Sequence, residues 1–234
     1  MGERPYVLLS CSMSLDGYLD SASEGRLLLS NEADFDRVDE VRSQCDAILV
    51  GAATVRNDNP ALLVRSEQRR QRRIDEGRPV TPAKVTLTSG GDLSRRARFF
   101  TTGDGERFVY APTLTAERLE PRLGAVATVV DRGDRVRMCE VAEDLHARGI
   151  RRLMVEGGGK VHTQFLTEGL VDELHLVVAP FFVGDSRARR FVRDGKFPWG
   201  ADRRATLVEA RPIGDVVLMR YALSGRFEDE PTSG

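Results

Sequence analysis

Short apolar runs alternate with helix-like apolar spacing over most of this chain. The runs have the length and composition of buried strands, and the continuous ones are typical of a parallel sheet covered on both faces. They span residues 6–13, 46–51, 84–88, 107–110, 125–130, 151–155 and 172–180. Because strands that alternate with helices form α/β folds, the pattern predicts a mostly parallel sheet flanked by helices.

Helical spacing begins after Asn31. Asn31 can cap a helix because acidic Glu32 and Asp34 suit its first turn, and apolar residues then recur every three or four positions up to Cys45. The other expected segments are helices at 115–119, 141–149 and 161–169, a loop at 54–60, and an arginine-rich solvated loop or surface helix at 65–78.

The end of the chain changes character. Residues 205–210 and 216–223 are predicted to be two strands joined by a hairpin turn at 212–215. The prediction is therefore an α/β fold whose sheet ends in an antiparallel C-terminal hairpin. A length of 234 residues suits one domain, which we place at residues 1–225, with a disordered polar tail at 226–234.

Charge and composition exclude several classes of protein. The 35 basic and 36 acidic residues leave a net charge of −1, which argues against bulk nucleic-acid or membrane-surface binding. No apolar run reaches the ~18 residues of a membrane span, and the first residues lack the apolar core of a signal peptide. Cys11, Cys45 and Cys139 are far apart and odd in number, so we expect free thiols in a soluble, cytoplasmic protein.

A glycine-rich turn follows the expected strand at 151–155. It reads Glu156-Gly157-Gly158-Gly159-Lys160 and leads into a helix whose buried face begins at Val161. Glycines allow a sharp turn and a close approach of a ligand to the backbone, and a helix N-terminus favours an anion such as a phosphate. The turn therefore indicates either a ligand site at the end of a strand or a plain strand-to-helix connection.

A second group of polar side chains follows the expected strand at 46–51. Thr54, Arg56, Asp58 and Arg65 come after small residues that permit close contact with a ligand. The planar fork of an arginine can bind a phosphate through two hydrogen bonds. Taken alone, the stretch is also compatible with an N-capped loop that carries surface salt bridges.

Four motifs in register give these stretches a common interpretation. They are Ser12-Met13-Ser14-Leu15-Asp16-Gly17, the segment from Asp46 to Pro60, the segment from Val155 to Lys160, and Gly169-Leu170-Val171-Asp172-Glu173. With them the chain resembles the pyrimidine reductases of riboflavin biosynthesis over residues 5–223. The resemblance implies a dihydrofolate-reductase-like fold. It is closest to stand-alone members, because no zinc deaminase motif precedes it.

The resemblance also implies an activity and its residues. It implies a homodimer that uses NADPH to reduce a phosphoribosylamino-pyrimidine to its ribitylamino form, with hydride passing to C1′ of the ring-opened sugar. Positions that hold the cofactor match Thr54, Asp58, Ser89, Gly157, Gly158, Gly159 and Lys160. Positions that hold the substrate match Arg42, Leu62, Arg65 and Glu156, and the two arginines suit its 5′-phosphate.

Asp58 is our first candidate for the carboxylate that handles a proton or polarises the substrate, and Glu156 is the second. A purely structural role as a hydrogen-bond acceptor is the alternative for each. The three histidines do not lie at metal-ligand spacing, so no metal site is expected, and His162 is expected to face solvent. Trp199 is expected to pack a loop. The apolar segments 174–182 and 216–223 are candidates for the dimer interface.

Departures from the family pattern leave alternatives open. Ser10 stands where bifunctional members usually carry a Lys, and Leu28 where they often carry a Trp, while Asn57 and Asn59 replace a frequent Ala and a frequent Asp. The same fold could therefore reduce a dihydropterin, dihydrofolate or a specialised-metabolite precursor. A nucleotide-binding protein without catalysis is disfavoured, because Thr54, Asp58 and Glu156 are all retained. A P-loop phosphotransferase is disfavoured, because Val161 follows Lys160 where the motif requires Ser or Thr.

Overall fold

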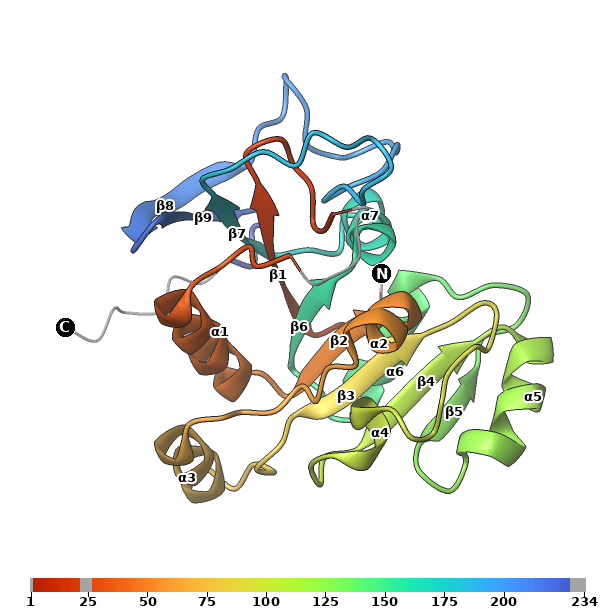
Figure 1. Cartoon of the computed structure of the whole chain (residues 1–234). Helices are drawn as coiled ribbons and strands as arrows, with labels where there is room; N and C mark the ends of the chain where they lie inside the picture. Colours follow the sequence, from red (N-terminus) through yellow and green to blue (C-terminus); the bar gives the residue numbers. More distant parts are fainter. Residues whose placement is uncertain (1, 22–26, 228–234) are drawn as a thin grey trace.

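The computed structural model describes residues 2–21 and 27–227, so Gly25 and most of the tail predicted at 226–234 lie outside the described residues. Within these ranges one sheet of nine strands has the order β5-β4-β3-β2-β6-β1-β7-β9-β8 (Figure 1). The strands are β1 (Tyr6–Ser14), β2 (Ala47–Gly51), β3 (Ala83–Leu87), β4 (Arg107–Ala111), β5 (Thr128–Asp131), β6 (Arg152–Gly157), β7 (Glu173–Ala179), β8 (Thr206–Ile213) and β9 (Val216–Ala222).

Strands β1 to β7 pair in parallel, whereas β9 pairs antiparallel with both β7 and β8. The predicted class, a mostly parallel α/β sheet with an antiparallel C-terminal hairpin, is therefore confirmed. The hairpin turn is tighter than expected, because only Gly214 and Asp215 connect the two strands and Pro212 lies inside β8. Gly214 has a φ of 62°, a backbone conformation that suits glycine in a two-residue turn.

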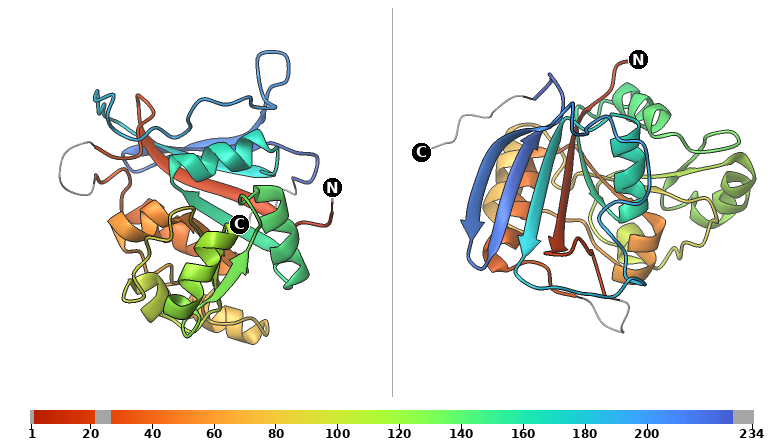
Figure 2. Two further views of the ribbon diagram at one scale, coloured as in Figure 1. Left: turned by 90° about the vertical axis from the view of Figure 1, so that its right-hand side faces the viewer. Right: turned by 90° about the horizontal axis from the view of Figure 1, so that it is seen from above.

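Helices cover both faces of the sheet (Figures 1 and 2). Side chains alternate between the two faces along each strand, so neighbouring strand residues enter different cores. Leu9 and Val155 pack with α6 and α7, whereas Leu8 and Ile48 pack on the opposite face with α1, α2, α4 and α5. The helices are α1 (Glu32–Gln44), α2 (Ala52–Asp58), α3 (Glu67–Asp75), α4 (Arg98–Thr101), α5 (Thr113–Leu123), α6 (Met138–Ala147) and α7 (Gly159–Thr167).

Helix α1 confirms the predicted cap. The Asn31 side chain accepts a hydrogen bond from the Asp34 backbone N–H at 3.0 Å, and its amide donates to the Ile213 carbonyl at 2.6 Å. The cap therefore satisfies a free N–H of the helix and also ties its start to the hairpin of β8 and β9. Cys45 is buried at the other end, and all three cysteines are free, as expected.

Two local predictions are wrong. Residues 54–60 were expected to form a loop, but most of them lie in α2, which starts directly after β2 with no side-chain cap at Gly51. The strand expected at 125–130 begins only at Thr128, because the N–H groups of Val126 and Ala127 bond back to the Leu123 carbonyl at the end of α5.

The arginine-rich segment forms the surface helix α3, but one of its arginines is buried. The Arg73 side chain is only 1% exposed, and it donates to the carbonyls of Ser43, Cys45 and Pro79 at 2.7–2.8 Å. It therefore satisfies carbonyls at the end of α1, next to the start of β2. The segment therefore stabilises the end of α1, and it is not wholly exposed to solvent.

The topology brings the sequence motifs together. Strands β2, β6 and β1 are neighbours in the sheet, although they come from distant parts of the chain. Helix α2 follows the carboxyl end of β2, and α7 follows the carboxyl end of β6. Ligands of open α/β sheets bind at this edge, where the strands end and the helices begin.

Candidate functional site

The glycine turn is shorter than its sequence indicates. Glu156 and Gly157 complete β6, Gly158 is the N-cap of α7, and Gly159 already belongs to the helix. Gly157 has a φ of 116°, which side chains rarely adopt. The peptide bond between Gly157 and Gly158 is cis. Strand and helix therefore meet at a single residue, Gly158.

The three glycines meet different neighbours. A Cβ on Gly157 would lie 2.8 Å from the His162 ring, and one on Gly159 would lie 2.3 Å from the Arg190 carbonyl oxygen. A Cβ on Gly158 would have Thr54 Oγ1 as its nearest neighbour, at 3.7 Å. Gly157 and Gly159 are thus required by the protein's own packing, whereas Gly158 leaves space between itself and Thr54 that a ligand can use.

A cavity of about 500 Å³ contains all four predicted substrate residues. Arg42, Leu62, Arg65 and Glu156 line it, together with Thr54 and Asp58. Ser10, at the position where a Lys is common, also lines it and is 6% exposed. The structure therefore brings these residues from α1, β6 and the segment after α2 to one place, while their individual roles stay predictions.

Arg42 and Glu156 form a bidentate ion pair in this cavity. Arg42 Nε donates to Glu156 Oε1 at 2.6 Å, and Nη2 donates to Oε2 at 2.7 Å. Burial alone would lower the pKa of Arg42, but the adjacent Glu156 carboxylate raises it. Each side chain is about 15% exposed. The pair fixes the orientation of both groups and engages each of them before any substrate binds.

The wall that carries Leu62 and Arg65 is fastened to α1 by Asp39. The buried Asp39 carboxylate accepts from the backbone N–H groups of Arg65 at 2.6 Å and Ser66 at 3.0 Å, and from Arg69 at 3.0 Å. Burial opposes ionisation, but these donors outweigh it and hold the pKa of Asp39 below its usual range. Leu62, with a φ of 51°, is buried within this fixed segment.

A second cavity, of about 580 Å³, contains most of the predicted cofactor residues. Thr54, Ser89, Gly158, Gly159 and Lys160 line it. Arginines also surround this cavity and outnumber its acidic residues, Asp92 and Asp134. They are Arg56, Arg135, Arg189, Arg190 and Arg193. This excess of positive charge over the start of α7 suits a ligand that carries several phosphates.

A third cavity, of about 650 Å³, joins the other two. It shares Thr54 with both of them and Asp58 and Glu156 with the first cavity. It shares Gly158 and Gly159 with the arginine-lined cavity. Leu28, at the position where a Trp is common, lines it and is 63% exposed. A long ligand could therefore extend from Lys160 past Gly158 and Thr54 to the substrate cavity.

His162 contradicts its predicted exposure. It is 1% exposed, lines the joining cavity, and contacts the Phe191 carbonyl through Nδ1 at 3.2 Å. Burial lowers the pKa of His162 to about 4. Its Nε2 is buried and has no hydrogen-bond partner among the described residues. The cause of the wrong prediction is that α7 packs against the segment around Phe191, which covers the helix face that would otherwise meet solvent.

Several lining residues were not identified as site residues from the sequence. Asp34 was recognised only as a helix-start acid, yet it is fully buried, lines the substrate cavity, and pairs with Arg37 at 2.7 Å and with Ser30. Cys11, Ser12 and Arg98 also line the cavities. Only Ser12 belongs to a recognised motif, and the others carry no local signal.

Two absences apply to the described residues only. No group of three or more His, Cys, Asp and Glu side chains there could hold a metal ion. None of the helices in residues 2–21 and 27–227 combines the length and apolar character needed to cross a bilayer. Trp199 packs in a loop as predicted, and its indole donates to the Leu223 carbonyl at 3.1 Å.

The model of one protein family, the RibD C-terminal domain, matches residues 5–219. The chain belongs to this family. It is 34% identical over 230 residues to the 2,5-diamino-6-ribosylamino-4(3H)-pyrimidinone 5′-phosphate reductase of Methanothermobacter thermautotrophicus, covering 95% of this chain and 100% of that protein. It is 35% identical over 182 residues to the enzyme of the same name from Archaeoglobus fulgidus, covering 77% of this chain and 83% of that protein.

Solved structures agree on the fold. A pyrimidine reductase-like protein from Corynebacterium diphtheriae superposes with a TM-score of 0.79 at 23% identity, covering 93% of this chain and 91% of that one. A deaminase/reductase from Thermotoga maritima superposes with a TM-score of 0.75, also at 23% identity, and covers 94% of this chain and 56% of that one. At this identity these likenesses support the architecture alone. The predicted family and fold class are both confirmed.

Proposed function

We propose that this member of the RibD C-terminal domain family is the reductase that converts 2,5-diamino-6-ribosylamino-4(3H)-pyrimidinone 5′-phosphate to its ribitylamino form. The observation that carries the proposal is the arrangement of the cavities. The expected substrate residues line one cavity, most of the expected cofactor residues line another, and Thr54 lines both. Two relatives of the chain, 34% and 35% identical to it, carry the name of this activity.

The proposed cofactor is NADPH, and the site has features that suit it. Gly158 offers an open backbone next to Thr54, and the first turn of α7 can receive a pyrophosphate. Lys160 and the arginines of the same cavity provide charge for the additional 2′-phosphate that distinguishes NADPH from NADH.

The chemistry requires one hydride and one proton. NADPH supplies a hydride when it is bound, and C1′ of the ring-opened sugar accepts it while the neighbouring nitrogen keeps or gains a proton. Asp58, exposed at the end of α2 and lining two of the cavities, is the proposed group for proton handling. Glu156 is tied to Arg42 through both oxygens, which suits a residue that orients the substrate.

The test is NADPH oxidation by the purified protein with the pyrimidinone phosphate, its deaminated counterpart and dihydrofolate. Turnover of a pyrimidine phosphate, with NADPH preferred over NADH, would support the proposal. Turnover of dihydrofolate alone would replace it with the alternative reduction. Asp58→Asn should lower kcat, and unchanged kinetics would remove Asp58 from the proposed proton-handling role.

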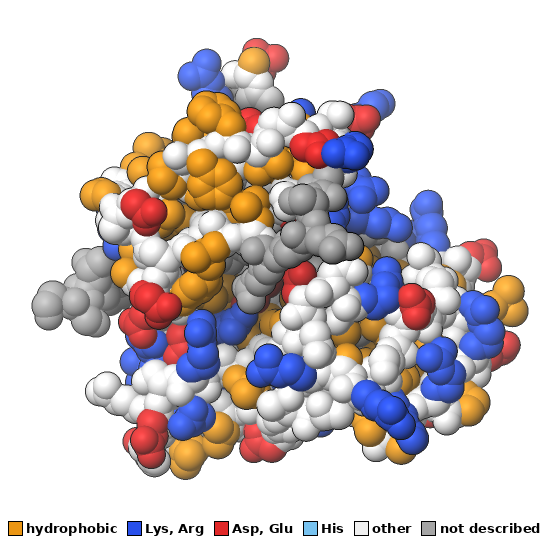
Figure 3. All heavy atoms as spheres, viewed as in Figure 1, with side chains coloured by type: hydrophobic (Ala, Val, Ile, Leu, Met, Phe, Trp, Pro, Cys, Tyr) orange, Lys and Arg blue, Asp and Glu red, His pale blue; other side chains and the backbone are white. Residues whose placement is uncertain are grey.

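We also propose a homodimer in the cytoplasm. The sheet face of β8 and β9 that carries Leu207, Val217 and Tyr221 is apolar, with Leu207 53% exposed and Val217 42% exposed. Figure 3 shows hydrophobic side chains gathered over the part of the molecule where Figure 1 places β7, β8 and β9. A face of this kind suits a second copy of the chain. Sedimentation should give a dimer, and Val217→Glu should shift it to a monomer. The three free thiols fit a reducing compartment.

A further inference from the structure

Ser30 and Asp34 form a hydrogen-bonded pair in the wall of the substrate cavity, and neither matches an expected site residue. Both line this cavity, and Ser30 also lines the joining cavity. Ser30 Oγ donates to one Asp34 oxygen, while Arg37 Nε donates to the other at 2.7 Å. Asp34 is fully buried and Ser30 is half-buried, so the hydroxyl is the part of the pair that a ligand can reach.

This contact commits the hydrogen of the Ser30 hydroxyl. A hydroxyl has one hydrogen and two acceptor lone pairs, whereas an ionised carboxylate only accepts. The hydrogen between the two groups therefore belongs to Ser30, and only the lone pairs of Ser30 Oγ are left for a ligand. A free serine hydroxyl rotates and can donate or accept, but this one is a fixed acceptor.

Neighbouring contacts hold the pair in place. Asn31, which follows Ser30, is tied to the hairpin of β8 and β9 by a hydrogen bond of 2.6 Å. Arg37 contacts His175 Nδ1 through Nη1 at 3.1 Å, so its guanidinium is held on both sides while it binds Asp34. An acceptor that is fixed in advance penalises a ligand that brings the wrong group to it.

The other carboxylates of the substrate cavity, Glu156 and Asp58, have different tasks. Glu156 accepts two hydrogen bonds from Arg42, so both of its oxygens are engaged. Asp58 is the proposed group for proton handling, and a group that exchanges a proton does not present a constant hydrogen-bonding pattern. Ser30 adds a constant, uncharged acceptor beside them.

The pyrimidine ring of the proposed substrate should lie next to Ser30. Hydride is proposed to reach C1′, which is joined to the ring through a single nitrogen, so the ring must lie where the substrate cavity meets the joining cavity. Ser30 and Phe35 line both cavities, and Phe35 offers a flat apolar surface to an aromatic ring. At C2 of this ring the diamino substrate carries an amino group, which donates, and the deaminated counterpart carries a carbonyl, which only accepts.

We propose that Ser30 Oγ accepts a hydrogen bond from the 2-amino group of the substrate, and that Asp34 is the positioning residue that keeps Ser30 an acceptor. The pair thereby selects the diamino substrate, because the carbonyl of the deaminated one would face a second acceptor. This inference rests on the proposed function, since it decides between two substrates of the same site.

The experiment compares kcat/KM for the two pyrimidine phosphates at saturating NADPH. The wild type should prefer the diamino substrate about a hundredfold or more, because a site built around a hydrogen bond rejects the analogue that cannot form it. Ser30→Ala should lower this ratio about tenfold or more. A wild type without the preference, or an unchanged ratio in Ser30→Ala, would overturn the inference.

Asp34→Asn tests the positioning role. Arg37 donates to this residue, so the asparagine oxygen should face Arg37 and its N–H groups should face Ser30. Ser30 then accepts from the amide, and its own hydrogen is free to point into the cavity. The value of kcat/KM for the deaminated substrate should therefore rise several-fold, which damage to the fold would not produce. A loss shared equally by both substrates would overturn the role given to Asp34.

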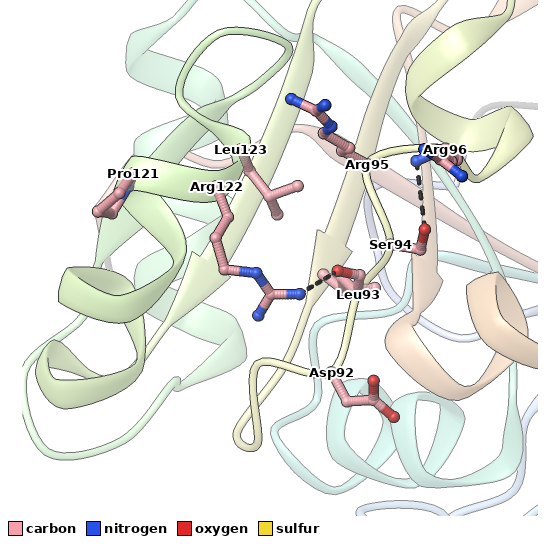
Figure 4. A pocket seen from close by; sticks show the side chains of 8 residues that line it. All are labelled: Asp92, Leu93, Ser94, Arg95, Arg96, Pro121, Arg122 and Leu123. Carbon is pink, nitrogen blue, oxygen red and sulfur yellow. Dashed lines mark hydrogen bonds between the residues drawn. The ribbon is translucent and has the colours of Figure 1, made fainter.

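Two other serines provide matched controls. Ser12 lines the same two cavities as Ser30, but within residues 2–21 and 27–227 no carboxylate accepts its hydrogen. Ser94 lines a separate pocket beside α5, where its Oγ accepts from the Arg96 backbone N–H at 3.3 Å (Figure 4). Ser12→Ala and Ser94→Ala remove the same hydroxyl group and should leave the substrate ratio unchanged. A shift in either as large as that of Ser30→Ala would overturn the inference.

A binding measurement separates this inference from the proposed function. The ring fragments 2,6-diamino-4-pyrimidinone and 6-aminouracil differ at C2, and calorimetry measures their binding without any turnover. The wild type should bind the diamino fragment more tightly, and Ser30→Ala should remove the difference, even if neither pyrimidine phosphate were reduced. Equal binding of the two fragments by the wild type would overturn the inference and leave the reductase activity to be judged by NADPH oxidation.

Discussion

Arg42 and Glu156 are 114 residues apart in the chain, yet their side chains are joined by two hydrogen bonds of 2.6 Å and 2.7 Å. Arg42 comes from the last turn of α1 and Glu156 from the end of β6. The pair spans the wall of the proposed substrate cavity and locks the two elements together. It is therefore a part of the site and also a contact that stabilises the fold.

Glu156→Gln should lower the free energy of unfolding, because it leaves the Arg42 guanidinium without its countercharge. Breaking a fully buried pair costs about 3–5 kcal/mol, and the partial exposure of this one reduces our expectation to about 2 kcal/mol. Urea denaturation measures the change. The double variant Arg42→Gln/Glu156→Gln should lose less than the sum of the single variants, and simple additivity would show that the pair contributes nothing of its own.

Gly158→Ala and Gly159→Ala should separate ligand binding from packing. Gly158 has a φ of −86° and free space around its Cβ position, so alanine should change the free energy of unfolding by less than about 0.5 kcal/mol. The methyl group would, however, occupy the space proposed for the pyrophosphate. NADPH affinity, measured by fluorescence quenching, should fall about tenfold or more.

Gly159→Ala is the counterpart of this variant. Its Cβ would lie 2.3 Å from the Arg190 carbonyl oxygen, which belongs to the backbone and cannot rotate away. The expected loss is about 1–3 kcal/mol of unfolding free energy, which calorimetry would register as a lower unfolding temperature. A stable Gly159→Ala protein, or NADPH binding unchanged by Gly158→Ala, would contradict this assignment of the glycines.

The sequence predicted the parallel strands and the end of the sheet at which the site would lie. It could do so because strand length, apolar runs and glycine turns are local signals. It missed α2 as a helix, since Asn57, Asp58 and Asn59 have low helix propensity and Gly51 provides no side-chain cap. That helix forms because Ala52 and Val55 pack against the sheet, which is a tertiary effect.

The pairings within the site could not be predicted. Which side chains meet depends on the order of β2, β6 and β1 in the sheet, and the sequence specifies no such order. The engagement of Arg42 by Glu156 depends on this order, because Glu156 ends β6. The burial of His162 did leave a signal, since it precedes Leu166 by four positions on the buried face of α7. His162 was nevertheless expected to face solvent, because histidine is a titratable residue type.

Asp39→Asn should weaken the wall that carries Arg65. The Asp39 carboxylate accepts three hydrogen bonds, and an asparagine would turn an N–H group toward at least one of these donors. The free energy of unfolding should fall by about 1–3 kcal/mol, and KM for the phosphorylated substrate should rise. Asp36→Asn is the control, because Asp36 pairs with the same Arg69 but is 69% exposed, and its loss should stay below about 1 kcal/mol. Equal losses of unfolding free energy in the two variants would contradict the role given to Asp39, which is to hold the segment of Leu62 and Arg65 against α1.

The buried His162 should make stability depend on pH in mildly acidic solution. Burial lowers its pKa in the folded protein from 6.5 to about 4, so between these values the unfolded chain binds a proton that the folded protein does not. Stability is therefore complete above pH 6.5 and falls as the pH drops through this window, by up to about 1.4 kcal/mol per pH unit.

His175 is also buried with a lowered pKa and adds a slope of its own. His162→Phe should therefore reduce the slope, measured by urea denaturation between about pH 5 and 6.5, without abolishing it. If His162→Phe kept the full slope, the neutral and buried state assigned to His162 would be wrong.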